Sequence, residues 1–154
     1  MKEHIGIIGQ VKARLRDEFG TLKLTVFKDN TIVYIGYDHI RQSISKSSGR
    51  PAAADYVALG TGASGVVLTD TTLGTEIVRK LSTFSMVETY PGFKDQWKLI
   101  TNFSGGEGTG TITESGVFNA VSGGSMLCRT VFSGIQKGSS DSLEFVWTFT
   151  VSQS

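Results

Sequence analysis

The residue pattern with the clearest chemical meaning is a glycine-rich run at residues 60–65, which begins Gly60, Thr61, Gly62 and follows a short apolar stretch. This G-x-G-x-x-G spacing is typical of loops that hold a dinucleotide pyrophosphate at the start of a helix. Residues 66–72 are β-branched and turn-forming, so they do not predict that helix. The run therefore indicates a flexible or partner-gripping loop, and we expect Gly60, Thr61 and Gly62 to contact a partner and the protein to need no cofactor.

Carboxylates and histidines were considered next as catalytic or metal-binding groups. Glu76, Glu107 and Glu114 could supply the paired carboxylates of a glycoside hydrolase, but acidic residues in turns near glycine are ordinarily surface residues. His4 and His39 have no second ligand at a metal spacing, so zinc is not expected. No nucleophile elbow accompanies the serines. We therefore predict that the protein is not an enzyme and carries no catalytic or metal site.

Composition limits the kind of partner. The chain has 154 residues, which suits one domain, and its 15 basic and 14 acidic residues create no field that favours nucleic acid or an acidic membrane. It lacks an apolar run long enough for a membrane span, and its first residues lack the apolar segment of a signal peptide. The single cysteine, Cys128, is expected to be a small core hydrophobe.

A basic row stands out near the N-terminus. Lys12, Arg14 and Arg16 alternate with apolar residues, and residues 1–50 hold nine Lys or Arg against five Asp or Glu. This row is a candidate contact for a neighbouring acidic surface, although a solvated hairpin face explains it equally well.

The strands that would position these residues follow from period-two alternation. Residues 11–16 and 21–27 predict an N-terminal hairpin around the turn at 17–20, and 31–35 predict a further strand. The spacing then becomes helical, which predicts one helix at 37–46 with Asp38 in its first turn. The remaining predicted strands lie at 56–59, 77–89, 96–103, 109–118, 125–132 and 142–151.

These elements predict an all-β protein, an antiparallel β-sandwich of jelly-roll-like type with an N-terminal β-hairpin and one short helix. We divide this single compact domain into residues 1–35, a docking segment of hairpin and strand, residues 36–55, helix and loop, and residues 56–154, the sandwich core. The apolar residues of the hairpin need a cover, which we expect a neighbouring subunit or a larger assembly to supply.

The last predicted strand has one large apolar face, because Leu143, Phe145, Trp147 and Phe149 occupy alternate positions. Alternation toward a core is the commoner cause of such a row. A carbohydrate-binding module would instead need exposed aromatic side chains, and that reading remains as an alternative.

Several segments together carry a resemblance. They are residues 56–62, 70–76 with Arg79, 110–120, 123–132, 137–138 and the strand around Trp147, and the Gly-Thr-Gly and Glu-x-Gly-hydrophobic-Phe elements are the most specific. Over roughly residues 9–151 this pattern resembles a family of small tailed-bacteriophage virion proteins described as structural, tail-fibre or head-decoration proteins.

The resemblance implies a non-enzymatic virion structural protein, made in the host bacterial cytoplasm and located in the virion. We expect a capsid decoration (cement) protein; a tail, neck or baseplate component such as a fibre-attachment protein is the alternative. The implied partners are further copies of the chain, as a trimer, and the major capsid or tail proteins, with no nucleic acid and no membrane.

Overall fold

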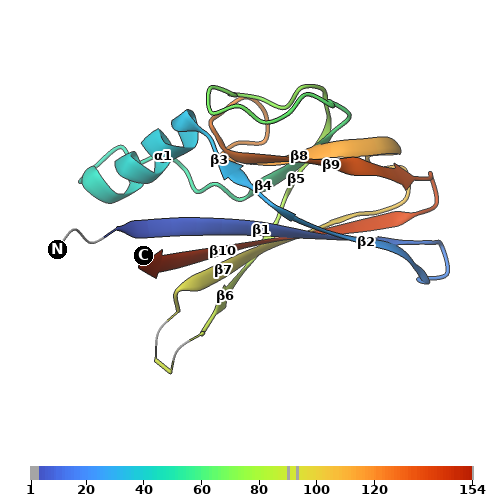
Figure 1. The fold of residues 1–154 in the computed structure, drawn as a ribbon, viewed down its shortest axis with the longest axis horizontal. Helices are drawn as coiled ribbons and strands as arrows, with labels where there is room; N and C mark the ends of the chain where they lie inside the picture. Colours follow the sequence, from blue (N-terminus) through green and yellow to red (C-terminus); the bar gives the residue numbers. More distant parts are fainter. Residues whose placement is uncertain (1–3, 90, 93, 154) are drawn as a thin grey trace.

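The computed structural model describes residues 4–89, 91–92 and 94–153, and these form two antiparallel sheets that pack face to face (Figure 1). The first sheet has the order β2 (Leu22–Asp29), β1 (Ile5–Arg16), β10 (Ser142–Gln153), β7 (Gln96–Phe103), β6 (Thr83–Val87). The second has the order β3 (Thr31–Ile32), β9 (Met126–Lys137), β8 (Gly110–Phe118), β4 (Tyr56–Gly60), β5 (Glu76–Leu81). Strands make up 53% of the chain, which confirms the predicted all-β sandwich.

The sheets are connected by a nested arrangement of strands. β7 pairs with β10 in the first sheet, whereas β8 and β9, which lie between them in sequence, pair with each other in the second. The β7–β10 pair and the β8–β9 pair thus form one antiparallel ribbon that passes from the first sheet into the second, as in jelly-roll folds. No helix among the described residues is long and apolar enough to cross a bilayer.

The N-terminal hairpin is confirmed, and its two strands are part of the first sheet of the sandwich. β1 lies between β2 and β10 and pairs with β10 along its whole length, from Ile5 opposite Gln153 to Arg16 opposite Ser142. Its odd positions, Val11, Ala13 and Leu15, belong to the main core. The chain itself therefore covers these β1 residues, whereas Leu22 and Leu24 of β2, for which we expected a partner, are exposed at 48% and 40%. Residues 1–3 of the predicted segment lie outside the described residues.

The predicted strand at 77–89 is two strands in different sheets. β5 pairs with β4 in the second sheet and β6 pairs with β7 in the first, and Ser82 lies between them. The Ser82 backbone N–H donates to the Asp55 carbonyl at 2.9 Å. The prediction of a single strand was wrong because both halves have a strand pattern, and that pattern does not report a change of partner.

The helix α1 spans Tyr34–Ser45, so it begins three residues earlier than predicted, and β3 is correspondingly limited to Thr31–Ile32. Asp38 therefore lies outside the first turn, which contains no acidic residue. Its carboxylate instead accepts hydrogen bonds from Arg41 and Gln42 on the same helix.

The core where the two sheets meet is apolar, and its largest side chains are aromatic. Phe145, Trp147 and Phe149 are fully buried, and the Trp147 and Phe149 rings stack with centroids 6.0 Å apart. Trp97 stacks on Phe149 from the neighbouring strand at 5.1 Å. Cys128 is buried, which confirms its predicted role, and burial raises the pKa of its thiol to about 12.

Candidate functional site

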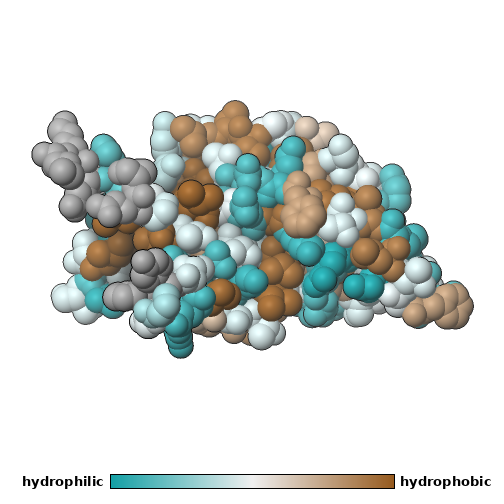
Figure 2. Space-filling model, turned by 60° about the horizontal axis from the view of Figure 1, so that its bottom comes forward, coloured by the Kyte–Doolittle hydropathy of each residue, from teal (hydrophilic) through white to brown (hydrophobic). Residues whose placement is uncertain are grey.

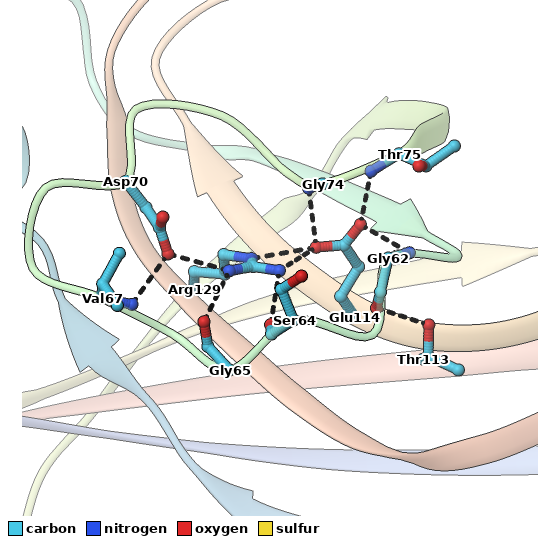
Figure 3. A network of polar contacts seen from close by, with 10 residues as sticks. All are labelled: Gly62, Ser64, Gly65, Val67, Asp70, Gly74, Thr75, Thr113, Glu114 and Arg129. Carbon is cyan, nitrogen blue, oxygen red and sulfur yellow. Dashed lines mark hydrogen bonds and ion pairs between the residues drawn. The ribbon is translucent and has the colours of Figure 1, made fainter.

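The loop at residues 61–75 lies over the outer face of the second sheet, and Glu114 of β8 holds it there (Figure 3). The Glu114 carboxylate accepts backbone N–H groups from Gly62 at 2.9 Å, Gly74 at 2.9 Å and Thr75 at 2.8 Å. The side chain is completely buried. The prediction of an ordinary surface residue was therefore wrong for Glu114.

The predicted glycine pattern has a structural reason at this carboxylate. A Cβ atom on Gly60 would lie 2.5 Å from Glu114 Oε1, and one on Gly62 would also collide with that oxygen. Only glycine lets the backbone approach the carboxylate this closely. β4 ends at Gly60 and no helix follows, so the geometry of a dinucleotide site is not formed.

Arg129 of β9 completes the network. Its guanidinium lies 2.7 Å from Glu114 Oε2 and 2.8 Å from Asp70 Oδ2, and it donates to the Ser64 carbonyl at 3.0 Å and the Gly65 carbonyl at 3.5 Å. The Arg129 side chain is 3% exposed. A buried arginine therefore ties the middle of the loop to the sheet through charge-assisted hydrogen bonds, while Glu114 holds its two ends. We call Asp70, Glu114 and Arg129 the ionic network.

The ionic network shifts the pKa values of its members. Burial alone raises the pKa of Glu114, but the backbone N–H groups and the Arg129 guanidinium that surround the carboxylate outweigh burial and hold its pKa below the usual value. Burial lowers the pKa of Arg129, and its hydrogen bonds to Glu114 and Asp70 raise the pKa above the usual value. Both groups are thus charged in the folded protein around neutral pH.

A second arginine fastens the neighbouring turn at residues 119–125. Arg79 of β5 donates to the carbonyls of Ala120 and Gly123 at 2.9 and 2.8 Å, pairs with Glu76, and lies 3.6 Å above the Phe118 ring. Together with a small apolar cluster that includes Leu73 and Phe118, these contacts close the outer face of the second sheet.

The geometry describes what these groups can do chemically. Glu114 accepts four hydrogen bonds and is ion-paired with Arg129, so the roughly four lone-pair positions of its carboxylate are already used. Glu76 pairs with Arg79 and Glu107 pairs with Lys80, so each of these carboxylates is engaged by a basic side chain of the same chain. No group of three His, Cys, Asp or Glu residues in the described ranges is arranged to hold a metal ion.

The basic row lies on the outer face of the first sheet, where hydrophilic and hydrophobic side chains alternate (Figure 2). Each member contacts its own chain: Arg14 pairs with Glu144, Lys12 lies 5.2 Å from the centre of the Phe27 ring, and Arg16 donates to the Gly20 carbonyl at 3.0 Å. The three side chains share one face of β1 and come from a different part of the chain than the glycine loop. Some of their hydrogen-bond donors and positive charge are already used within the chain.

Asp70 and Arg129 were not recognised from the sequence. A signal for Arg129 does exist: in the β8–β9 hairpin Gly116 lies opposite Arg129, so Glu114 and Arg129 occupy diagonal positions on the same face. An opposite-charge pair across a predicted hairpin is readable from sequence. Asp70 has no such signal, because it reaches the arginine through an irregular loop.

No protein-family model, no curated protein and no solved structure matches this chain.

Proposed function

We propose that this chain is a structural protein of a tailed-bacteriophage virion and that it acts as a capsid decoration protein, bound as a trimer to the outside of the shell. The observation that carries the proposal is the position of the segments that bear the resemblance. Residues 56–62, 70–76, 110–120 and 123–132 form β4, β8, most of β9 and the loop above them, and they meet at the ionic network.

The loop at 61–75 is the surface that we propose contacts the shell. It is about fifteen residues long without regular secondary structure, a length that is uncommon in compact domains except in functional loops. Val67 and Leu68 are exposed on it, at 55% and 40%. A loop already held in one conformation loses less conformational entropy when it binds, which favours a stable contact. In this proposal Gly60 and Gly62 position the loop. Thr61 is exposed and would contact the shell.

The carbohydrate-binding alternative is not favoured by the positions of the exposed aromatic residues. Within the described part of the chain they lie in the hairpin turn, on β2, on α1 and on β6, rather than along one sheet face: Phe19, Phe27, Tyr34, Tyr37 and Phe84.

Copy number in purified virions tests the proposed role. Quantitative gel analysis should find hundreds of copies per particle for a decoration protein, whereas a few to tens would assign the chain to the neck, tail or baseplate. Absence from the particle would reject the virion proposal. Light scattering of the purified chain checks the trimer.

A matched pair of variants tests the loop contact. Val67→Asp with Leu68→Asp should abolish incorporation while the circular dichroism spectrum is retained. Val121→Asp, at an exposed apolar position in the 119–125 turn, should incorporate normally. Normal incorporation of the loop variant would place the shell contact elsewhere.

A further inference from the structure

A half-enclosed cavity of about 470 Å³ opens between the two sheets at the end of the sandwich where α1 lies (Figure 1). Its walls are apolar side chains from α1 and from strands of both sheets, among them Ile40, Leu99 and Leu127. The volume falls within the range of small-molecule sites, about 300 to 1,000 Å³. Two apolar residues of the lining, Ile44 and Phe84, are themselves largely exposed, so the mouth of the cavity is apolar as well.

One polar side chain in this wall lacks a partner. His39 is 8% exposed, and within the described part of the chain its imidazole makes no hydrogen bond; only its carbonyl is bonded, by the Ser43 hydroxyl at 2.9 Å. Burial lowers the pKa of His39, and the nearby Asp38 charge only partly opposes this, so the ring is neutral at pH 7. A neutral imidazole offers one donor and one acceptor, and because the His39 ring nitrogens are not among the fully buried unpaired atoms, they remain accessible to a ligand.

The charge of the wall limits the ligand further. Among the residues that the structure describes, no Lys or Arg lines the cavity, and Asp55 is the one acidic residue of the lining. An anionic head group would lose hydration there without gaining a counter-charge.

We propose that the cavity binds a neutral amphiphile, with the apolar body between the sheets and a hydroxyl or carbonyl group hydrogen-bonded to His39. This site is separate from the loop surface of the proposed function and does not depend on it. It shares no residue with the ionic network.

The test is a fluorescence titration of the full chain with N-phenyl-1-naphthylamine, a neutral apolar probe, followed by displacement with decan-1-ol or decanoate at pH 7. We expect saturable binding of one probe per chain, and displacement by the alcohol at a concentration at least about tenfold lower than by the carboxylate, a difference of about 1.4 kcal/mol. The absence of saturable binding, or equal displacement by both, would overturn the proposal. Tighter binding of decylamine than of the alcohol would assign the head group to Asp55 and overturn the role of His39.

Variants locate the site. Ala54→Phe, which fills the cavity, should weaken probe binding at least about tenfold, as should Ile44→Lys at the exposed rim, where folding is not at risk. Val121→Phe adds apolar bulk outside the cavity and should have no effect. His39→Leu should retain the probe but reduce the preference for alcohol over the probe several-fold. Unchanged probe binding in both Ile44→Lys and a folded Ala54→Phe would contradict the site. Probe binding only after the chain is diluted to a dissociated state would also contradict it, and would assign the cavity to a neighbouring copy of the chain.

Discussion

The two faces of the second sheet are covered by different chemistry. The inner face packs on the first sheet through an apolar core, in which Trp147 and its neighbours exclude water without directional bonds. The outer face is closed by a loop that depends on Glu114, Arg129 and Asp70, each with specific donors and acceptors. An apolar contact weakens gradually when it is altered, whereas a buried ion pair becomes unfavourable as soon as one charge loses its partner. The two faces should therefore respond differently to substitution.

The largest loss of stability is expected when the hairpin is removed. This deletion disrupts the apolar core against the inner face of the second sheet and leaves the ionic network on its outer face in place. Deletion of residues 1–30 removes Val11, Ala13 and Leu15 from the core and exposes the edge of β10. We expect residues 31–154 to show no cooperative thermal transition by circular dichroism. A cooperative transition with a native β spectrum would show that the inner face does not need β1. As a control, Lys12→Ala with Arg16→Ala should unfold cooperatively in the full chain.

Trp147→Ala should lower the free energy of unfolding by about 3–5 kcal/mol, because it leaves a large cavity in the inner core. Thr148→Ala, on the opposite face of the same strand, should change the free energy of unfolding by less than about 0.5 kcal/mol. Urea denaturation measures both values. Equal losses would contradict the inward orientation of the odd positions of β10.

Arg129→Met tests the ionic side at a similar magnitude. It leaves the buried Glu114 charge without its counter-charge and should cost about 3–5 kcal/mol in urea denaturation. The double variant Glu114→Gln with Arg129→Met should cost less than the single one, because the buried charge is removed together with its partner. Arg41→Met, an exposed arginine that also has an acidic partner, serves as the control and should have no resolvable effect. A double variant less stable than Arg129→Met would contradict this account of the ionic side.

Gly62→Ala should lower the free energy of unfolding by a smaller amount, about 1–3 kcal/mol. The methyl group of the introduced alanine would collide with the Glu114 carboxylate, so the loop must shift. Gly65→Ala lies in the same loop with open space around its Cβ position and should be neutral. Thermal denaturation compares the two. If both variants unfold at the same temperature, the glycine at 62 has no close-approach role.

The smallest expected effect concerns acid. The pKa of Glu114 is lower in the folded than in the unfolded state, so its contribution to stability is complete above the unfolded value, about 4.5, and is lost as pH falls through the folded value. The free energy of unfolding should therefore decrease below about pH 4.5, and Glu114→Gln should flatten part of that decrease. Part should remain, because hydrogen bonds from Lys80 and Ser104 lower the pKa of Glu107 to about 2. An unchanged pH profile in Glu114→Gln would assign the acid sensitivity to other carboxylates.

The sequence was informative where a local pattern decides the structure. The strands at 96–103, 109–118 and 142–151 are found within two residues of their predicted limits, because alternation toward a core is a local signal. The strand at 77–89 was misread because alternation does not specify which neighbour a strand pairs with. The burial of Glu114 was missed for a related reason: it depends on Arg129 and on a loop that begins 52 residues earlier in the chain, at Gly62.

The passage of the chain from β5 to β6 through the single residue Ser82 has a mechanical consequence. Two trans peptide units span at most about 7 Å, less than the spacing of about 10 Å between packed sheets, so the layers cannot separate further at this point unless residues of β5 or β6 leave their strand pairing. At this edge the two sheets are joined by the backbone as well as by the packing of their side chains. A force that pulls the two layers apart at this edge is carried by the backbone at Ser82, next to Asp55 and Phe84 in the wall of the cavity beneath α1.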